Sequence, residues 1–203
     1  MWPDLGYIKP DACFPFTIGH TRRARTGEGW LGPGRRSPLS PASHASVTDI
    51  RAKFGSGWSV STDSVAGGKS TSEMSRVDGG ANGSKGSLQI SGNIDAGLPD
   101  AWSGVMFSPG PTPFAAANLS SKKSIHFWAR GDARTYRVMV FTQAGGYMPS
   151  QQTFVAGPDW KEFSFPFSAF SGTDGRDITA VIFAAGTPAG SFQFFIDDVR
   201  LDP

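Results

Sequence analysis

The stretch Ser124-Ile125-His126-Phe127-Trp128-Ala129-Arg130 places an apolar side chain at every second position. This spacing puts its apolar side chains on one face of a β-strand. The turn Gly131-Asp132 follows at once, and the apolar run Tyr136-Arg137-Val138-Met139-Val140-Phe141-Thr142 comes next. The short polar connection predicts that the two runs pair as a β-hairpin.

Strand patterns continue on both sides of this pair. Residues 87–91 alternate cleanly, and residues 178–184 are almost entirely apolar, which predicts a central strand. Residues 160–167 alternate Phe with polar residues but contain Pro166, which favours a strand end or an edge. No helical periodicity lies between these runs. Residues 47–203 are therefore predicted to form one all-β domain, an antiparallel β-sandwich of the jelly-roll kind.

Residues 1–46 differ from the rest of the chain in composition and in apolar patterning. Pro and Gly recur there without a period, as in Trp30-Leu31-Gly32-Pro33-Gly34-Arg35-Arg36-Ser37-Pro38, and most of the excess positive charge lies there. Such a segment buries too little apolar surface to offset its chain entropy, so we predict that it is disordered. Two alternatives stay open: a basic tail that touches an anionic surface, or upstream sequence translated from a misplaced start.

The composition argues against several classes of function. The net charge is only +2 and the predicted domain is nearly neutral, which argues against nucleic-acid binding. Cys13 is the single cysteine, so no disulfide is expected, and no Cys/His cluster has zinc spacing. No apolar run is long enough for a membrane span. No signal peptide is apparent, so we expect a cytoplasmic location as written, or a periplasmic or extracellular one if the true N-terminus is missing.

Four short motifs together carry a resemblance to a known family. They are Phe54-Gly55-Ser56-Gly57-Trp58-Ser59-Val60-Ser61-Thr62-Asp63-Ser64 with Gly67-Gly68-Lys69-Ser70, Trp102-Ser103-Gly104, the stretch 124–132, and Phe195-Ile196-Asp197-Asp198-Val199-Arg200-Leu201. In their order and spacing they resemble the complex I intermediate-associated protein 30 family, over residues 49–201.

The resemblance implies a fold and a range of roles. The fold would be the galactose-binding-type jelly roll, similar to many carbohydrate-binding modules. Bacterial domains of this kind stand alone or are appended to amidohydrolase-like proteins, whereas the mitochondrial member assists assembly of respiratory complex I. One departure is the Asp-Phe-Glu-like triplet of the opening strand, which is absent near Ser46-Val47-Thr48. Either that strand has diverged, or the chain has lost it and would expose a sheet edge.

Catalytic patterns are scarce in the predicted domain. No Gly-x-Ser-x-Gly elbow or metal-binding His pair is present, and His126 is expected to point away from the core. Gly67-Gly68-Lys69-Ser70 lacks the spacing of a phosphate loop and no helix pattern follows it. We therefore predict a binding domain without catalytic activity, with a hydrolase as the alternative.

Asp63 and Asp197 are the candidates for a structural Ca²⁺ site, which jelly-roll binding modules often hold between the N-terminal strand region and the last strand. Asp197 falls within an apolar strand, where a charge must be paired or metal-bound. The alternative for Asp197 is that its carboxylate caps backbone amides or pairs with an Arg.

A saccharide site would need an aromatic plate with polar side chains beside it. The candidates on or near the middle strands are Trp102, Arg134, Tyr136, Gln143 and Tyr147. The predicted function is thus carbohydrate-binding-like, in a monomer whose partner is a carbohydrate or a protein. The alternatives are a protein-interaction or assembly-factor domain and an accessory domain detached from an amidohydrolase-like enzyme.

Overall fold

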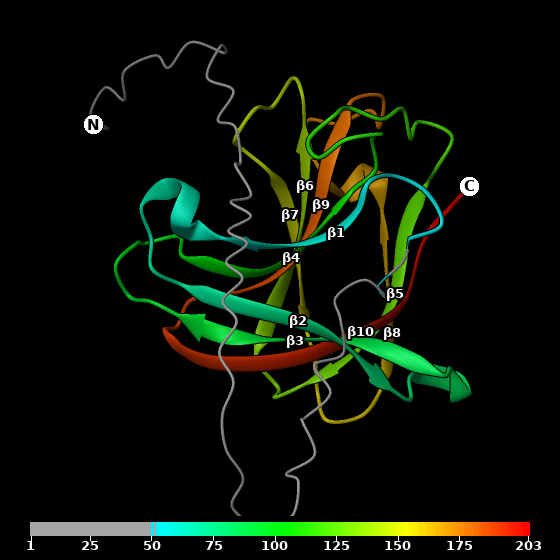
Figure 1. Cartoon of the computed structure of the whole chain (residues 1–203). Coiled ribbons are helices and arrows are strands. Elements are labelled where there is room, and N and C mark those ends of the chain that lie inside the picture. The colour runs from blue at the N-terminus through cyan, green and yellow to red at the C-terminus, as the bar shows by residue number, and fades with distance from the viewer. Residues whose placement is uncertain (1–49, 51) are drawn as a thin grey trace, which may run out of the picture. The chain divides into compact units, whose positions relative to one another are not determined.

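The computed structural model describes residue 50 and residues 52–203, which belong to one compact unit, Ser43–Pro203. Ten strands in this range form two five-stranded antiparallel sheets (Figure 1). The all-β sandwich fold is therefore confirmed. The predicted disordered segment 1–46 and the predicted start of the domain at residue 47 lie outside the described residues.

Sheet A has the strand order β1-β4-β9-β6-β7. Its strands are β1 Gly57–Thr62, β4 Trp102–Ser108, β9 Ile178–Gly186, β6 Thr135–Thr142 and β7 Ser150–Val155. The apolar run at 178–184 is the central strand β9, as predicted, because both of its faces meet apolar neighbours.

Sheet B has the strand order β2-β3-β10-β5-β8. Its strands are β2 Thr71–Asp78, β3 Gly86–Ile94, β10 Gly190–Asp202, β5 Ser124–Gly131 and β8 Lys161–Pro166. Pro166 ends the edge strand β8, where its missing N–H leaves no central ladder incomplete, as predicted. Three short 3-10 helices, Asp63–Ala66, Ala81–Gly83 and Phe167–Ala169, are the helical turns of the described residues.

The predicted hairpin between residues 124–130 and 136–142 is wrong. β5 pairs with β10 and β8 in sheet B, whereas β6 pairs with β9 and β7 in sheet A. The short connection crosses from one sheet to the other, so the two runs face each other across the core. A period of two specifies a buried face, and it says nothing about the strand that lies alongside.

The core lies between the sheets and is rich in aromatic rings. Phe127 of sheet B contacts Phe183 and Phe154 of sheet A, with ring centroids 4.9 Å and 5.0 Å apart. Phe163 and Phe165 of β8 stack on the same Phe127 ring. These edge-to-face and stacked contacts hold the sheets together through dispersion and buried apolar area.

Tyr136 adds a polar tie to this core. Its side chain is fully buried, and its one hydroxyl proton is shared between Asp132 Oδ1 at 2.7 Å and the Gln193 carbonyl at 3.1 Å. The hydrogen bonds join β6 of sheet A to β10 of sheet B and to the turn between β5 and β6. Within the described residues, no helix is long and apolar enough to cross a membrane.

Candidate functional site

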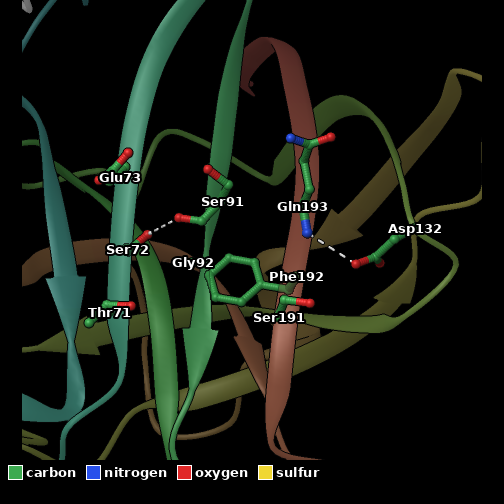
Figure 2. Close-up of a pocket in the computed structure, with 9 residues that line it drawn as sticks. All are labelled: Thr71, Ser72, Glu73, Ser91, Gly92, Asp132, Ser191, Phe192 and Gln193. Atoms are coloured by element: carbon green, nitrogen blue, oxygen red, sulfur yellow. Dashed lines mark hydrogen bonds between the residues drawn. The ribbon is translucent and has the colours of Figure 1, made fainter.

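A polar groove of about 650 Å³ crosses the outer face of sheet B. Figure 2 shows it over β2, β3 and β10, with Asp132 reaching its rim from the turn after β5. Its lining residues are Thr71, Ser72, Glu73, Ser91, Gly92, Asp132, Ser191, Phe192 and Gln193. We call this surface the sheet B groove.

The strand register explains how distant parts of the chain meet in the groove. Glu73 pairs with Ser91, and Ser91 pairs with Gln193, so the three residues form one row across β2, β3 and β10. Paired residues on one face of a sheet lie roughly 5 Å apart. The row therefore presents a carboxylate, a hydroxyl and an amide on neighbouring strands of one face.

Asp132 is held rigidly at the rim. Its Oδ1 accepts from the Tyr136 hydroxyl and, at 3.1 Å, from the Arg134 backbone N–H, while its Oδ2 accepts from the Gln193 N–H at 3.0 Å. Both oxygens are thus engaged within the protein. Asp132 fixes the position of β10 at Gln193 and so fixes one wall of the groove.

The polar side chains of the row are available to bond a ligand. Among the described residues, the side chains of Glu73, Ser91 and Gln193 make no hydrogen bond of their own. Figure 2 shows the Gln193 amide extending along the groove beside Ser91. The lining carries no Lys or Arg, so it suits a ligand that donates hydroxyl groups better than a phosphate.

Phe192 lies beneath the groove on the core face of sheet B. Its ring is buried in the core, with ring centroids 6.5 Å from Tyr136 and 6.2 Å from Phe194. A Cβ atom at Gly92 would lie only 1.9 Å from the Thr71 carbonyl oxygen and 2.9 Å from the tip of the Phe192 ring, so this position requires a glycine.

A strip of stacked side chains lies beside the groove on the same face. Phe195 is two residues along β10 from Gln193, and it pairs with Arg130 of β5. The guanidinium of Arg130 is 4.4 Å from the centroid of the Phe195 ring and 5.2 Å from that of the Trp160 ring. We call Phe195, Arg130 and Trp160 the aromatic strip. It extends the groove with flat, half-buried surfaces.

The outer face of sheet A is different in character. Met106, Met139 and Ile182 pair across β4, β9 and β6 and are buried together with Ala180 and Ala184. Trp102 and Phe141 pack against this small cluster, whose members are all apolar. The centre of the face is therefore apolar, although Arg137 pairs with Ala184 there and its guanidinium lies near Gly186.

The structure does not gather the five predicted ligand residues into one site. Trp102 lies on the outer face of sheet A, and its indole N–H donates to Ser61 Oγ at 3.4 Å. Tyr136 was predicted to contact ligand; in the structure its side chain is fully buried, faces inward on β6 and serves as the polar tie described above.

The remaining three predicted residues lie on loops. Arg134 donates to the carbonyls of Gly186, Pro188 and Ser191, so it clamps the connection between β9 and β10. Gln143 and Tyr147 are exposed in the loop between β6 and β7, and Tyr147 is 95% exposed. That loop follows the end of β6 remote from Gly186, whereas Trp102 pairs with Gly186, roughly 20 Å away along the sheet.

Asp63 and Asp197 do not form a shared metal site. Asp63 is buried and accepts from the Ser70 N–H and hydroxyl at 3.0 Å and 2.7 Å, just before β2. Asp197 accepts from the Ala81 and Asp198 N–H groups, both at 2.8 Å, near the far end of β2. Because β2 separates them, the carboxylates lie roughly 25 Å apart.

The surroundings of these two carboxylates do not fit a calcium ion. No group of three or more Asp, Glu, His or Cys side chains gathers as a metal site within the described residues. Backbone amides and a hydroxyl occupy the oxygens instead, which for Asp197 is the amide-capping alternative.

His126 does not form a catalytic triad. It points away from the core, as predicted, and its Nε2 lies 3.0 Å from Ser124 Oγ and 3.2 Å from Ser164 Oγ. Asp202 approaches the same Nε2 at 3.5 Å, and the buried Nδ1 has no partner in the described part of the chain. A triad needs the carboxylate on the other ring nitrogen, where it orients the imidazole.

Sequence reasoning missed Glu73, Ser91 and Gln193. Each sits at a polar position in an alternating strand, and alternation identifies these positions only as outward-facing. Nothing local marks the three strands as neighbours. The signal that could have found them is the strand pairing of β2, β3 and β10, which is long-range.

The chain matches a known family over most of its length. The family model described as complex I intermediate-associated protein 30 matches residues 49–195. The chain belongs to this family. The match agrees with the motifs that suggested it and includes every residue of the sheet B groove. No curated protein matches the chain significantly.

Solved structures similar to this member of the complex I intermediate-associated protein 30 family include carbohydrate-binding modules and an agarase. A family 11 carbohydrate-binding module from Clostridium thermocellum, solved with a β-1,3-1,4-mixed-linked tetrasaccharide, is 20% identical with a TM-score of 0.55, over 71% of this chain and 88% of the module. The family 11 module of the cellulosomal cellulase Lic26A-Cel5E of the same organism is 19% identical with a TM-score of 0.57, over 76% and 91%.

The third similar structure is an exo-β-agarase. It is 10% identical with a TM-score of 0.52, and the match covers 71% of this chain and 23% of the agarase. At these identities the likeness establishes the jelly-roll fold alone.

Proposed function

We propose that this domain binds a saccharide chain in the sheet B groove and has no catalytic activity of its own. The observation that carries the proposal is a groove of about 650 Å³ whose row of carboxylate, hydroxyl and amide ends lies free of internal partners, beside flat aromatic surfaces. Sugars are held by this combination, because rings cover their C–H faces while polar side chains bond their hydroxyls.

The arrangement of carboxylates supports binding over hydrolysis. Glycoside hydrolysis uses two carboxyl groups that flank the scissile bond. In the groove, Asp132 accepts hydrogen bonds on both oxygens, which leaves Glu73 without a second free carboxylate among the lining residues. The geometry around His126 offers no alternative nucleophile system.

The test is affinity electrophoresis of the full chain in gels that contain soluble neutral polysaccharides, β-glucans among them. We expect at least one polysaccharide to retard the protein. Glu73→Ala and Gln193→Ala should each weaken binding about tenfold, since each removes a hydrogen bond to the ligand.

Two variants serve as controls in the same gels. Tyr147→Ala changes an exposed loop residue, and Trp102→Ala changes the outer face of sheet A; both should leave the retardation unchanged. Loss of binding in Trp102→Ala alone, with Gln193→Ala unaffected, would place the ligand on sheet A and contradict the proposal. So would the absence of retardation by every polysaccharide tested.

A protein partner is the second candidate, and one observation favours it. Tyr147 and Met148 are 95% and 81% exposed in the loop between β6 and β7, and large exposed apolar side chains mark contact surfaces between proteins. This surface is separate from the sheet B groove, so the two candidates predict different effects for Tyr147→Ala.

A further inference from the structure

We propose that Arg130 reads an acidic group on the ligand, so that the site prefers saccharides that carry carboxylates, such as uronates, over neutral chains of the same linkage. The inference rests on the proposed saccharide-binding function and adds the class of sugar. It follows from the environment of one guanidinium on the outer face of sheet B.

The guanidinium of Arg130 lies against two aromatic rings. Its carbon is 4.4 Å from the Phe195 ring centroid and 5.2 Å from the Trp160 ring centroid. Contact with two rings restricts the motion of the side chain. The side chain is therefore preorganised to meet a planar acceptor, which lowers the entropy lost on binding.

The same guanidinium has no acidic partner within the described residues. Its Nε is buried without a hydrogen-bond acceptor, and no carboxylate lies within ion-pair distance. The nearby carboxylates of this face are engaged elsewhere: Glu162 pairs with Arg200, and Asp132 accepts from Tyr136 and from the backbone of β10. A half-buried, unneutralised cation thus stands beside the groove.

The positions of the charges indicate how an acidic sugar would lie. Arg130 is in the row next to the one that holds Glu73, Ser91 and Gln193, because Phe195 and Gln193 are alternate residues of β10. One step between rows is roughly 7 Å, about the extent of a single sugar ring. A uronate carboxylate can meet the fork of Arg130 in a bidentate pair while the hydroxyls of the adjoining unit reach Glu73 and Gln193.

The experiment compares acidic polysaccharides with their neutral esters. Binding of the full chain is measured for polygalacturonate against its methyl ester, and for alginate against its propylene glycol ester, because each pair keeps one backbone and removes the charge. We expect at least one acidic form to bind about ten- to a hundredfold more tightly than its ester. Arg130→Gln should abolish that preference, so that the acid and ester forms bind with the same affinity.

Two further variants keep the outcome decisive. Arg176→Gln removes the same charge from an exposed loop and should keep the full preference, which separates a specific contact from net charge. Arg130→Lys keeps the charge but loses the planar fork, so the preference should fall several-fold while the thermal midpoint stays near that of the parent; this variant carries the test if Arg130→Gln does not fold.

Each failure has a distinct meaning. Equal affinity for acid and ester forms in both pairs, a preference that survives Arg130→Gln, or equal losses in Arg130→Gln and Arg176→Gln would overturn the role of Arg130 while saccharide binding stands. Absence of binding to every acidic, esterified and neutral polysaccharide would instead overturn the proposed function.

Discussion

The outer faces of the two sheets carry opposite chemistry on the same architecture. On sheet A, Met106, Ile182 and Met139 form a buried apolar row across β4, β9 and β6. On sheet B, the row across β2, β3 and β10 is polar and lies in an open groove. We propose that the hydrogen-bonding groups of sheet B that lack a partner within the described residues, and not the Trp102 ring of sheet A, mark the ligand site.

The largest expected change in stability comes from placing a polar side chain in the apolar row of sheet A and an apolar side chain in the polar row of sheet B. Ile182→Gln should lower the free energy of unfolding by roughly 3 kcal/mol, because it removes buried apolar surface and places an amide where the cluster offers no partner. The reciprocal change Gln193→Ile, on an exposed position, should alter stability by no more than about 0.5 kcal/mol.

Urea unfolding of the two variants measures this difference directly. Binding should show the reverse order, since Gln193→Ile removes a groove amide whereas Ile182→Gln lies on the other sheet. Equal stability losses would mean that the outer face of sheet A is not a second apolar core.

An intermediate effect concerns Tyr136, which ties the two sheets. Burial and the hydrogen bond to Asp132 raise the pKa of Tyr136 far above its usual value. Above pH of about 10 the unfolded chain loses the phenol proton while the folded chain keeps it, so the unfolded state binds fewer protons and stability falls as pH rises. Below that pH the group adds no pH dependence.

Comparison with Tyr136→Phe isolates this group from the other alkaline titrations. Between about pH 9 and pH 11 the parent should lose about 1.4 kcal/mol more stability than Tyr136→Phe does. Chemical denaturation at the two pH values gives both numbers. Parallel losses in parent and variant would show that the phenol is not held neutral in the fold.

The smallest expected effect concerns Arg200, which is paired with carboxylates, whereas Arg130 on the same outer face of sheet B has no such partner within the described residues. Arg200 forms ion pairs with Glu162, Asp198 and Asp202, and the hydrogen bond to Glu162 raises its pKa. Because these side chains are partly exposed, solvent screens the pairs, and Arg200→Gln should cost at most about 1 kcal/mol, less in high salt.

Saccharide binding should be unchanged in Arg200→Gln, since its guanidinium is already satisfied by protein carboxylates. Thermal unfolding at low and high ionic strength, together with the gel assay, checks both points. A loss of binding as large as that of Arg130→Gln would remove the distinction between a paired and an unpaired arginine.

The sequence by itself determined several of the strands and which of their faces point inward, but it did not predict β2 or β7. Alternation identified β3, β5 and β8, the unbroken apolar run identified β9 as central, and Pro166 marked an edge, because these signals depend only on the local period of two and on one missing N–H. The family motifs could also be recognised from the sequence alone, since they are short and contiguous.

Only the tertiary structure decided which strands are neighbours, and therefore which residues form the candidate site. The turn after β5 crosses between sheets instead of closing a hairpin, and Glu73 and Gln193 lie in one row on either side of Ser91 although most of the domain separates them in sequence. Strand pairing is set by the packing of whole faces against one core, which no single segment encodes. The free polar row and the stacked Arg130 exist only once that packing is complete.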